Sequence, residues 1–446
     1  MIESVRRYLG LLRQADFRRL WLSMSVSALG SEVTFLALPL VAILVLHASP
    51  VEVAALGAMP FVAFAMFGLP AGVWVDRVPR KRVMVIGDLG RAAVLVLIPI
   101  LSATGAIAMW QLYVIAFIAG VLTVFYEIAY QSILPELVER DRLAEGNSRL
   151  EVSRAASQVV GPGLGGALVG IVGPALAIVA DAVSFLGSAA FLIGIHPSRP
   201  RALRKAADSP GLIREILEGL RFYRSNRILL SASAAVILMV SGAHMAGVIA
   251  LIFYVRELQM SPEAIGIAFG IGSIGYLVGA AGGAALGRRL GVGWTLIVGC
   301  GVSSAAWYLL VLATKDTGFA LLSAVGIIQG LTLPPVFVNN VALRQTLAPD
   351  ALVGRINATA RWMHWTAIPF GQLVGGALAT VIGLRSTIAI GATVGIASVA
   401  VLLLSPLRKL HDMPPAAHHA TPDEPDGAAT NPLDEPTLPL GQAPVG

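Results

Sequence analysis

Residues 72–82 read Gly-Val-Trp-Val-Asp-Arg-Val-Pro-Arg-Lys-Arg and lie between two long apolar runs. The stretch carries four basic side chains and a single carboxylate, Asp76. Basic residues gather in the short loops that membrane proteins keep on the cytoplasmic side. The stretch therefore predicts a cytoplasmic loop between two transmembrane helices.

The composition of the whole chain agrees with a membrane protein. Of its 446 residues, 56% are hydrophobic and only 13% are charged, whereas soluble domains carry roughly 25% charged residues. The net charge of +6 does not indicate nucleic-acid binding, because the basic residues lie in short loops between apolar runs. The single cysteine, Cys300, excludes an internal disulfide and a cysteine-based metal cluster. We interpret it as a small buried hydrophobic residue.

Twelve apolar runs are long enough to cross a bilayer, since a membrane helix needs roughly 20 apolar residues. A backbone in lipid must satisfy its own hydrogen bonds, so we expect each run to be an α-helix. The first run is too long for a cleaved signal peptide. The predicted fold class is an all-α integral membrane protein with twelve transmembrane helices. The expected helices cover residues 18–46, 52–75, 82–104, 108–133, 149–171, 174–195, 226–255, 262–287, 292–313, 317–343, 354–381 and 383–405.

The distribution of Lys and Arg predicts the orientation of the chain. Only Arg256, Lys315 and Arg385 lie in the odd-to-even loops, and Arg91 lies inside a helix. The other 28 of the 32 basic residues lie in or beside the N-terminal segment, the even-to-odd loops and the start of the tail. The positive-inside rule then places both termini in the cytoplasm, in a multi-pass protein of the inner (cytoplasmic) membrane.

The chain divides into four expected segments. Two six-helix bundles, 1–195 and 226–405, flank a cytoplasmic linker, 196–225, with a short amphipathic helix on the membrane surface. The tail, 406–446, is rich in Pro, Ala, Asp and Glu and is expected to be disordered. The bundles echo each other at an offset near 210, a plan typical of secondary transporters with a central site. The matching residues are Asn147, Gly161, Gly165, Gly166, Ala167 and Leu168 with Asn357, Gly371, Gly375, Gly376, Ala377 and Leu378.

The loop at 72–82 resembles the signature G-x-x-x-D-R-x-G-R-[RK] of the major facilitator superfamily. A proline, Pro79, stands where glycine is usual. The resemblance implies a conformational gate motif, in which the glycine lets helices approach and the aspartate can meet a helix N-terminus. Asp88 and Arg91, three residues apart on one helix, can pair and are grouped with this motif, more as a structural pair than as a substrate site. The predicted gate residues are Gly72, Asp76, Arg77, Arg80, Lys81, Asp88 and Arg91.

A second stretch, residues 161–166, resembles the G-P-x-x-G-G motif of the exporter branches of this superfamily. Its motif residues are Gly161, Pro162, Gly165 and Gly166. Small residues allow close helix crossing, and the proline kinks the helix. Further stretches resemble the branch that contains macrolide efflux pumps and enterobactin exporters, and the resemblance covers about residues 17–405. These stretches are 17–21, 30–32, 37–39, 87–91, 134–138 and 181–185.

The resemblance implies a secondary transporter that exports small amphipathic molecules, which in that branch are drug-, siderophore- or lipid-like. It implies proton antiport as the energy source and no bound cofactor. Residues 111–130 contain no basic residue, although many drug–proton antiporters have an arginine in the fourth helix. Proton coupling must then depend on other groups.

Four ionisable residues inside the expected helices are candidates for that coupling, because ionisable groups in a membrane are costly and mark transport pathways. Glu32 lies about 18 Å into the first helix at 1.5 Å per residue, and Glu127 lies deep in the fourth. His244 and His364 lie in the middle of the seventh and eleventh helices and could carry protons. The alternatives are a buried structural hydrogen bond for each glutamate and ordinary core packing for each histidine. Asp181 is interpreted as structural.

Aromatic and polar residues near these groups are candidates for the substrate cavity. Trp362 and Trp365 flank His364 and could form a wall for a flat substrate, or could equally face lipid. Asn339 could bind substrate or cap a helix end. The complete predicted cavity set is Glu32, Phe35, Tyr126, Tyr130, Asn339, Trp362 and Trp365.

Other functions are less compatible with the sequence. An uptake or facilitated-diffusion carrier of the same fold remains an alternative, and a membrane receptor or scaffold is a remote one. The chain contains no G-x-S-x-G, H-E-x-x-H or P-loop motif, so it is not expected to be an enzyme or to hold a metal. The expected partners are a small-molecule substrate and the lipid bilayer, with no nucleic acid and a monomeric state.

Overall fold

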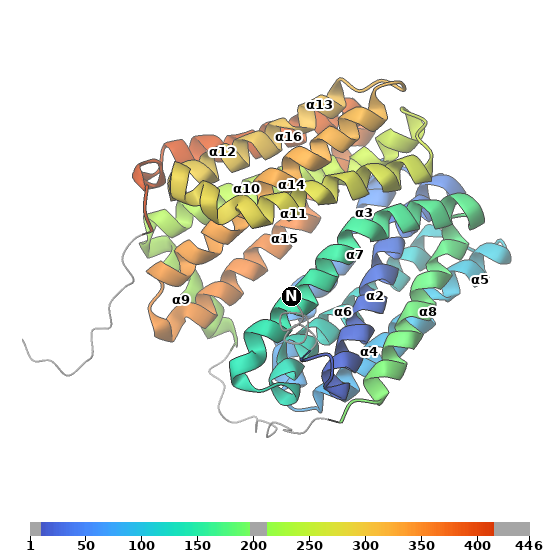
Figure 1. Ribbon diagram of the computed structural model, residues 1–446. Coiled ribbons are helices and arrows are strands. Elements are labelled where there is room, and N and C mark those ends of the chain that lie inside the picture. The colour runs from blue at the N-terminus through green and yellow to red at the C-terminus, as the bar shows by residue number, and fades with distance from the viewer. Residues whose placement is uncertain (1–9, 197–211, 414–446) are drawn as a thin grey trace, which may run out of the picture.

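The computed structural model describes residues 10–196 and 212–413, and within these ranges its regular secondary structure is entirely helical (Figure 1). Twelve helical segments are long and apolar enough to cross a membrane, which confirms the predicted fold class. The helices are α2 (Ala15–Leu40) continued by a π-helical turn (Val41–Val45), α3 (Pro50–Val75), α4 (Arg80–Leu95), α5 (Leu97–Ala103), α6 (Met109–Leu137), α7 (Leu143–Val172), α8 (Pro174–Ile193), α9 (Leu212–Ser225), α10 (Arg227–Arg256), α11 (Pro262–Leu290), α12 (Val292–Ala305), α13 (Trp307–Val311), α14 (Gly318–Leu347), α15 (Asp350–Ile382) and α16 (Leu384–Leu403).

Local sequence signals explain where several helices begin and end. Ser49 and Glu52 form a reciprocal capping box at the start of α3, and Pro50 occupies the first turn. Gly173 and Gly383 end α7 and α15 with φ of 82° and 84°, a backbone conformation that glycine adopts without steric cost. These two glycines are 210 residues apart, the same offset that relates the two halves in sequence.

The helices form two groups in space. The first, the N-half, contains α2–α8, drawn in blue to green, and the second, the C-half, contains α10–α16, drawn in yellow-green to red (Figure 1). Within the N-half α2 packs on α7 and α8, and within the C-half α10 packs on α15 and α16. The main contacts between halves join α3 to α15 and α7 to α11.

The membrane helices run between two ends of the molecule (Figure 1). The end that carries α9 and the Pro406–Lys409 turn we call the linker end. The opposite end we call the far end. At the far end one hydrophobic core contains residues of both halves, including Leu40, Ile98, Ile249 and Ile265. At the linker end each half has a separate hydrophobic core. One core surrounds Phe17 in the N-half, and the other lies in the C-half. The two halves are therefore joined at the far end and separate at the linker end.

Small residues make the far-end contacts possible. A Cβ on Gly376 of α15 would lie 3.0 Å from the carbonyl oxygen of Pro50 on α3. A Cβ on Gly166 of α7 would lie 3.1 Å from the Cα of Gly266 on α11. Arg256 also donates a hydrogen bond across the halves to the carbonyl of Ala48, at 2.6 Å. Close approach of this kind depends on the missing side chains.

The linker ends of the same helices are open. Among the described residues, no atom of a neighbouring element lies within 4 Å of the position that a Cβ would take on Gly72, Gly282 or Gly354. Trp74, near the linker end of α3, is 65% exposed. The close helix approach expected at Gly72 is therefore not present in this conformation.

The connecting segments contain more packed structure than the sequence indicates. The expected amphipathic helix forms as α9 and packs on α15 and α10. Its Tyr223 is 1% exposed, and Glu218 forms an ion pair with Arg355. The tail, expected to be disordered from residue 406, first forms a 3₁₀ turn, Pro406–Lys409, and then binds the start of α12 through backbone hydrogen bonds from Val292 and Gly293. Residues 414–446 and 197–211 lie outside the described residues.

Candidate functional site

Glu32 lies on α2 and is partly buried against α7. A Cβ on Gly161 would lie 2.8 Å from the Cγ of Glu32 and even closer to its Cβ. One turn further along α7, a Cβ on Gly165 would lie 3.2 Å from the Cα of Val33. Gly161 and Gly165 of the predicted exporter motif thus hold α7 against the helix that carries Glu32.

Other charged groups lie near Glu32 and Tyr130 in the N-half. Arg154, on α7, interacts electrostatically with Glu32 and with Tyr130 of α6. Tyr130 also lies within electrostatic range of Glu127 and Glu151. We call Glu32, Glu127, Glu151, Arg154 and Tyr130 the acidic cluster. It joins α2, α6 and α7 and contains three carboxyl groups and a single guanidinium.

The opposite side of α7, at Pro162 and Gly166 of the exporter motif, packs against the C-half. A Cβ on Gly166 would clash with backbone atoms of Pro262 and Gly266 on α11, and a Cβ on Gly266 would in turn clash with the carbonyl of Pro162. Ser273 of α11 donates a hydrogen bond to the carbonyl of Gln158, at 2.8 Å. Helix α7 therefore contacts Glu32 of the N-half on one side and α11 of the C-half on the other. We call the far-end contacts of α7 with α11 and of α3 with α15 the far-end closure.

An aromatic cluster crosses between the halves. Trp365 of α15 stacks on Phe64 of α3 with ring centroids 4.3 Å apart, and it also contacts Phe61 at 5.7 Å. Phe61 meets the ring of His244 edge-on at 5.9 Å. Arg361 lies 5.9 Å from the ring centre of Phe64, within cation–π range. Trp365 and His244, predicted separately, are thus brought together.

The other predicted C-half residues take different positions. His364 is partly buried, and its Nε2 atom has no hydrogen-bond partner within the described part of the chain. Trp362 is partly buried as well. Asn339 does not fit the predicted cavity set: it is 8% exposed, donates to the carbonyl of Pro335 on its own helix, and packs beside Gly287 of α11.

The predicted gate motif forms a network within the N-half at the linker end. Arg80, buried at the start of α4, pairs with Asp76 of the loop at 3.2 Å and with Glu136 at the end of α6. Lys81 donates to the carbonyls of Ile193 and Ile195, both at 2.7 Å, and so covers the end of α8. The motif therefore ties four helices of one half together. Arg77 is exposed.

Asp88 and Arg91 form the predicted pair deep inside the N-half, at 2.5 Å. Ser188 donates to the other carboxylate oxygen of Asp88, at 2.6 Å. The Arg91 guanidinium lies between the rings of Tyr126 and Phe185, 4.3 and 4.0 Å from their centres. Tyr126 was predicted to line the cavity, but it is 2% exposed and belongs to this buried packing instead.

Comparison with known proteins agrees with this architecture. Residues 8–429 match a family described as transmembrane secretion effector, part of the major facilitator superfamily. The chain belongs to this family. It is a membrane transporter of the efflux branch and not an enzyme, which confirms the resemblance that the two motifs indicated.

Several curated relatives of this transporter are similar over most of their length. The uncharacterized MFS-type transporter YfiS of Bacillus subtilis is 27% identical, covering 83% of this chain and 88% of the relative. The multidrug efflux pump Tap of Mycolicibacterium fortuitum is 27% identical, covering 80% and 87%. Macrolide efflux protein A of Streptococcus pyogenes is 25% identical, covering 78% and 86%.

Solved structures of other transporters share the fold. The nucleoside transporter NupG has a TM-score of 0.72 at 11% identity, covering 87% of this chain and 98% of that one. A bacterial homologue of the iron transporter ferroportin has a TM-score of 0.66 at 19% identity, covering 88% and 98%. At such identities the likeness concerns the fold alone.

Sequence reasoning missed several residues of this transporter that the fold brings to the site. Glu151 and Arg154 precede Gly161 by ten and seven residues on α7, and the i, i+7 spacing that puts Arg154 on the same helix face as Gly161 could have signalled it. Phe61 and Phe64 lie on α3 at i, i+3. Phe35, which was included in the predicted cavity set, is 69% exposed.

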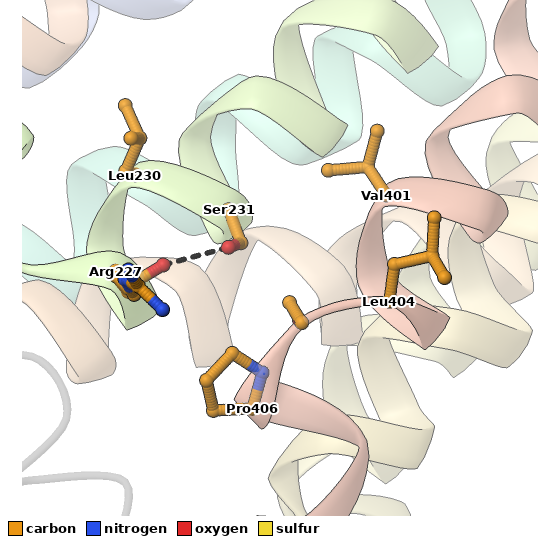
Figure 2. A pocket seen from close by; sticks show the side chains of 7 residues that line it. Arg227, Leu230, Ser231, Val401, Leu404 and Pro406 are labelled. Carbon is orange, nitrogen blue, oxygen red and sulfur yellow. Dashed lines mark hydrogen bonds between the residues drawn. The ribbon is translucent and has the colours of Figure 1, made fainter.

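A surface cavity of about 310 Å³ lies elsewhere on the transporter, at the linker end of α10 and α16 (Figure 2). Arg227 and Ser231 of α10 face Leu404 and Pro406 across it, and Ser231 donates to the carbonyl of Arg227 at 2.6 Å. It has no contact with the acidic cluster. In the ranges 10–196 and 212–413, no three His, Cys, Asp or Glu side chains are grouped closely enough to hold a metal ion.

Proposed function

We propose that this transporter exports small amphipathic molecules from the cytoplasm by alternating access, in exchange for protons. The observation that carries the proposal is the acidic cluster around Glu32, which lies in the N-half beside α7, the helix that also contacts the C-half. Ionisable groups inside a transporter are costly unless they serve the transport pathway. The gap between the linker ends of the halves gives these carboxyl groups a route to one side of the membrane.

The direction of opening follows from the charge distribution. The linker end carries the basic residues of the even-to-odd loops, so the positive-inside rule assigns it to the cytoplasm. The conformation described is then open to the cytoplasm and closed to the outside by the α3–α15 and α7–α11 contacts. Both termini lie in the cytoplasm, and the membrane is the inner (cytoplasmic) membrane of the cell.

The charge of the acidic cluster favours substrates with a positive charge. Three carboxyl groups share the space with only one guanidinium, Arg154. The aromatic cluster of Phe61, Phe64 and Trp365 adds flat apolar surface, which suits the hydrophobic part of an amphipathic molecule. The names of two relatives, a macrolide efflux protein and a multidrug efflux pump, agree with such substrates.

Proton exchange would use the carboxyl of Glu32. Its neighbour Arg154 carries the opposite charge. Binding of a cationic substrate would displace the proton, and release outside would allow the next proton to bind. Glu127 and Glu151 would keep the vestibule negative, and His244 and His364 are the further candidates for carrying protons.

The experiment is transport into everted membrane vesicles, in which export appears as uptake. Vesicles from cells that produce this transporter should accumulate radiolabelled erythromycin or ethidium when a proton gradient is imposed, and an uncoupler should abolish the accumulation. Accumulation that an uncoupler does not affect would indicate facilitated diffusion. Uptake into intact cells in place of everted vesicles would indicate the alternative carrier and would contradict export.

A susceptibility screen identifies the class of compound that this transporter exports. Strains that lack or overproduce this transporter should differ by about fourfold or more in their susceptibility to cationic amphipathic compounds, and less for anionic ones of similar size. Equal susceptibility to every compound class would contradict the proposal.

A further inference from the structure

A buried arginine lies at the linker end of the C-half, outside the acidic cluster. Arg344 is in the last turn of α14 and is 9% exposed. Helical side chains lean toward the helix N-terminus, and Arg344 accordingly donates to Asn340, one turn back, at 2.5 Å. Its Nε also donates to Asn357 of α15 at 3.3 Å.

Arg344 lacks the carboxylate partner that other buried arginines have. Arg80 pairs with Glu136, and Arg91 pairs with Asp88. Arg344 forms no ion pair with any carboxylate in the described ranges, and both of its hydrogen bonds go to neutral amides. A buried charge without an opposite charge is strongly unfavourable. The amide oxygens and the end of α14 reduce this cost but leave a net positive charge.

Three further polar atoms around Arg344 are buried without a hydrogen-bond partner. They are the Tyr223 hydroxyl, the Ser233 hydroxyl and the Asn340 Nδ2 amide. Tyr223 is close enough to Arg344 and Ser233 to interact with both, but neither contact has the geometry of a formed hydrogen bond. The three residues are 1%, 2% and 2% exposed. Buried polar atoms that lack partners are rare in proteins and point to an unseen partner.

All three atoms can act as donors. Burial raises the pKa of Tyr223 above its ordinary value, so its hydroxyl keeps its proton and can donate. The side-chain oxygen of Asn340 already accepts from Arg344, so its Nδ2 group is left with only donors. His364, seven residues after Asn357 on α15, also lies within electrostatic range of Arg344. Donors around an unpaired cation are complementary to an anion.

We propose that a small inorganic anion, chloride, binds among Arg344, Asn340, Tyr223 and Ser233. The anion supplies the missing negative charge and accepts hydrogen bonds from α9, α10 and α14. A water molecule could accept from one or two of these donors but would leave the positive charge of Arg344 uncompensated. The high burial of all four residues selects a small anion over a lipid phosphate.

The position of the site gives the anion a structural role. Tyr223 belongs to α9, the helix of the linker between the two halves, whereas the other three ligands belong to the C-half. Bound chloride would therefore fix the linker helix to α10 and α14. The stability of the C-half would then depend on the chloride concentration.

The test is the thermal unfolding of the purified full-length protein in detergent. Sodium chloride and sodium gluconate are compared at equal ionic strength, so that screening is the same in both. Chloride should raise Tm by about 2–4 °C at saturation, and bromide should do the same. Phosphate should not, and a rise with phosphate or anionic lipid alone would overturn the choice of chloride. Equal Tm values in chloride and gluconate would overturn the site.

Two variants locate the effect. Arg344→Gln should abolish the chloride-dependent rise in Tm, and Tyr223→Phe, which removes a single donor, should raise the half-saturating chloride concentration severalfold. Arg355→Gln is the matched control, because it breaks the half-buried ion pair between α15 and α9 and involves none of the four proposed ligands. The control should keep the full response. If Arg344→Gln does not fold, an unchanged response in Tyr223→Phe would overturn the proposal.

Discussion

At the scale of single residues, the proposed mechanism depends most on the contact between Glu32 and Gly161. The side chain of Glu32 fills the space that the missing side chain of Gly161 leaves on α7. The same carboxyl has Arg154 as its electrostatic partner, on the same helix as Gly161. The position and the charge of Glu32 therefore both depend on α7.

Removing the charge of Glu32 tests its role. Glu32→Gln keeps the shape of the side chain but cannot exchange a proton, so proton-driven export should fall by about tenfold or more with normal protein levels in the membrane. Export is measured in everted vesicles. Glu257→Gln, which alters an exposed glutamate paired with Arg385, should leave export unchanged. Full export by Glu32→Gln would eliminate its role in coupling.

The ion pair of Arg80 and Glu136 should contribute mainly to stability. Both side chains are more than nine-tenths buried, and removing one partner of such a pair costs about 3–5 kcal/mol. Glu136→Gln should therefore lower Tm by several degrees, whereas Glu257→Gln in its exposed pair should change the stability by about 0–1 kcal/mol. Thermal unfolding in detergent measures both. Equal Tm values for the two variants would contradict the assignment.

Residue positions along a helix could be predicted from the sequence, but the direction of each side chain could not. Glu32 and Trp365 were expected near the space between the halves, and the structure brings both to contacts beside it. Tyr126 and Asn339 lie at suitable depths but face other helices of their own half. The spans of this chain are apolar around their whole circumference, so periodicity does not reveal which face is buried in protein and which meets lipid or a cavity.

Helix α7 acts as a shared element. Gly161 and Gly165 contact α2, while Gly166 and Pro162 contact α11 in the other half. A change at Glu32 can therefore reach the far-end closure through one helix. The equivalent glycines of α15 repeat this arrangement, since Gly371 and Gly375 face α10 and Gly376 faces α3.

Two alanine substitutions on α7 test this arrangement. Gly161→Ala would place a methyl group against Glu32 and should destabilise the protein by about 1–3 kcal/mol and reduce export. Gly163 belongs to the same stretch, but within the described part of the chain no atom of a neighbouring element lies within 4 Å of the position that its Cβ would take. Gly163→Ala should therefore leave Tm and export close to wild type. Similar losses in both variants would show that the contact with Glu32 is not what matters.

Element boundaries were largely predictable, and the packing of α9 was not. Hydrophobic length located the membrane helices to within a few residues in most cases. Helices α7, α14 and α15 extend further at the linker end than expected, because polar residues can continue a helix beyond the membrane. The apolar face of α9 signalled an amphipathic helix, but the same pattern suits a membrane surface and a protein surface.

At the scale of the whole molecule, the fold consists of two related halves that meet along two helix pairs. The offset of 210 residues seen in the sequence recurs in the geometry, at Gly173 and Gly383 and at the two glycine motifs. The halves share a core at the far end only. Rocking about the contacts of α3 with α15 and α7 with α11 would close the linker ends, where Gly72, Gly282 and Gly354 have free space.

The conformational state was not predictable from the sequence. Both states of an alternating-access transporter are encoded by one chain, and the hydrophobic pattern is the same in each. The space beside Gly72 is a property of this conformation. The role of Gly72 in helix approach stays a prediction.

A disulfide between α7 and α11 tests whether the far-end closure must open during export. The position of a Cβ on Gly170 of α7 lies 3.0 Å from Cγ of Glu263 on α11, which suits a disulfide between Gly170→Cys and Glu263→Cys. Native Cys300 is buried and would not compete. Each single cysteine variant serves as a control.

Export of erythromycin by everted vesicles is measured before and after oxidation, and again after reduction. The double variant should lose export by about tenfold or more when oxidised and recover it when reduced, while both single variants should be unaffected. Full export by a quantitatively cross-linked protein would contradict this prediction, since the far end would then have no need to open.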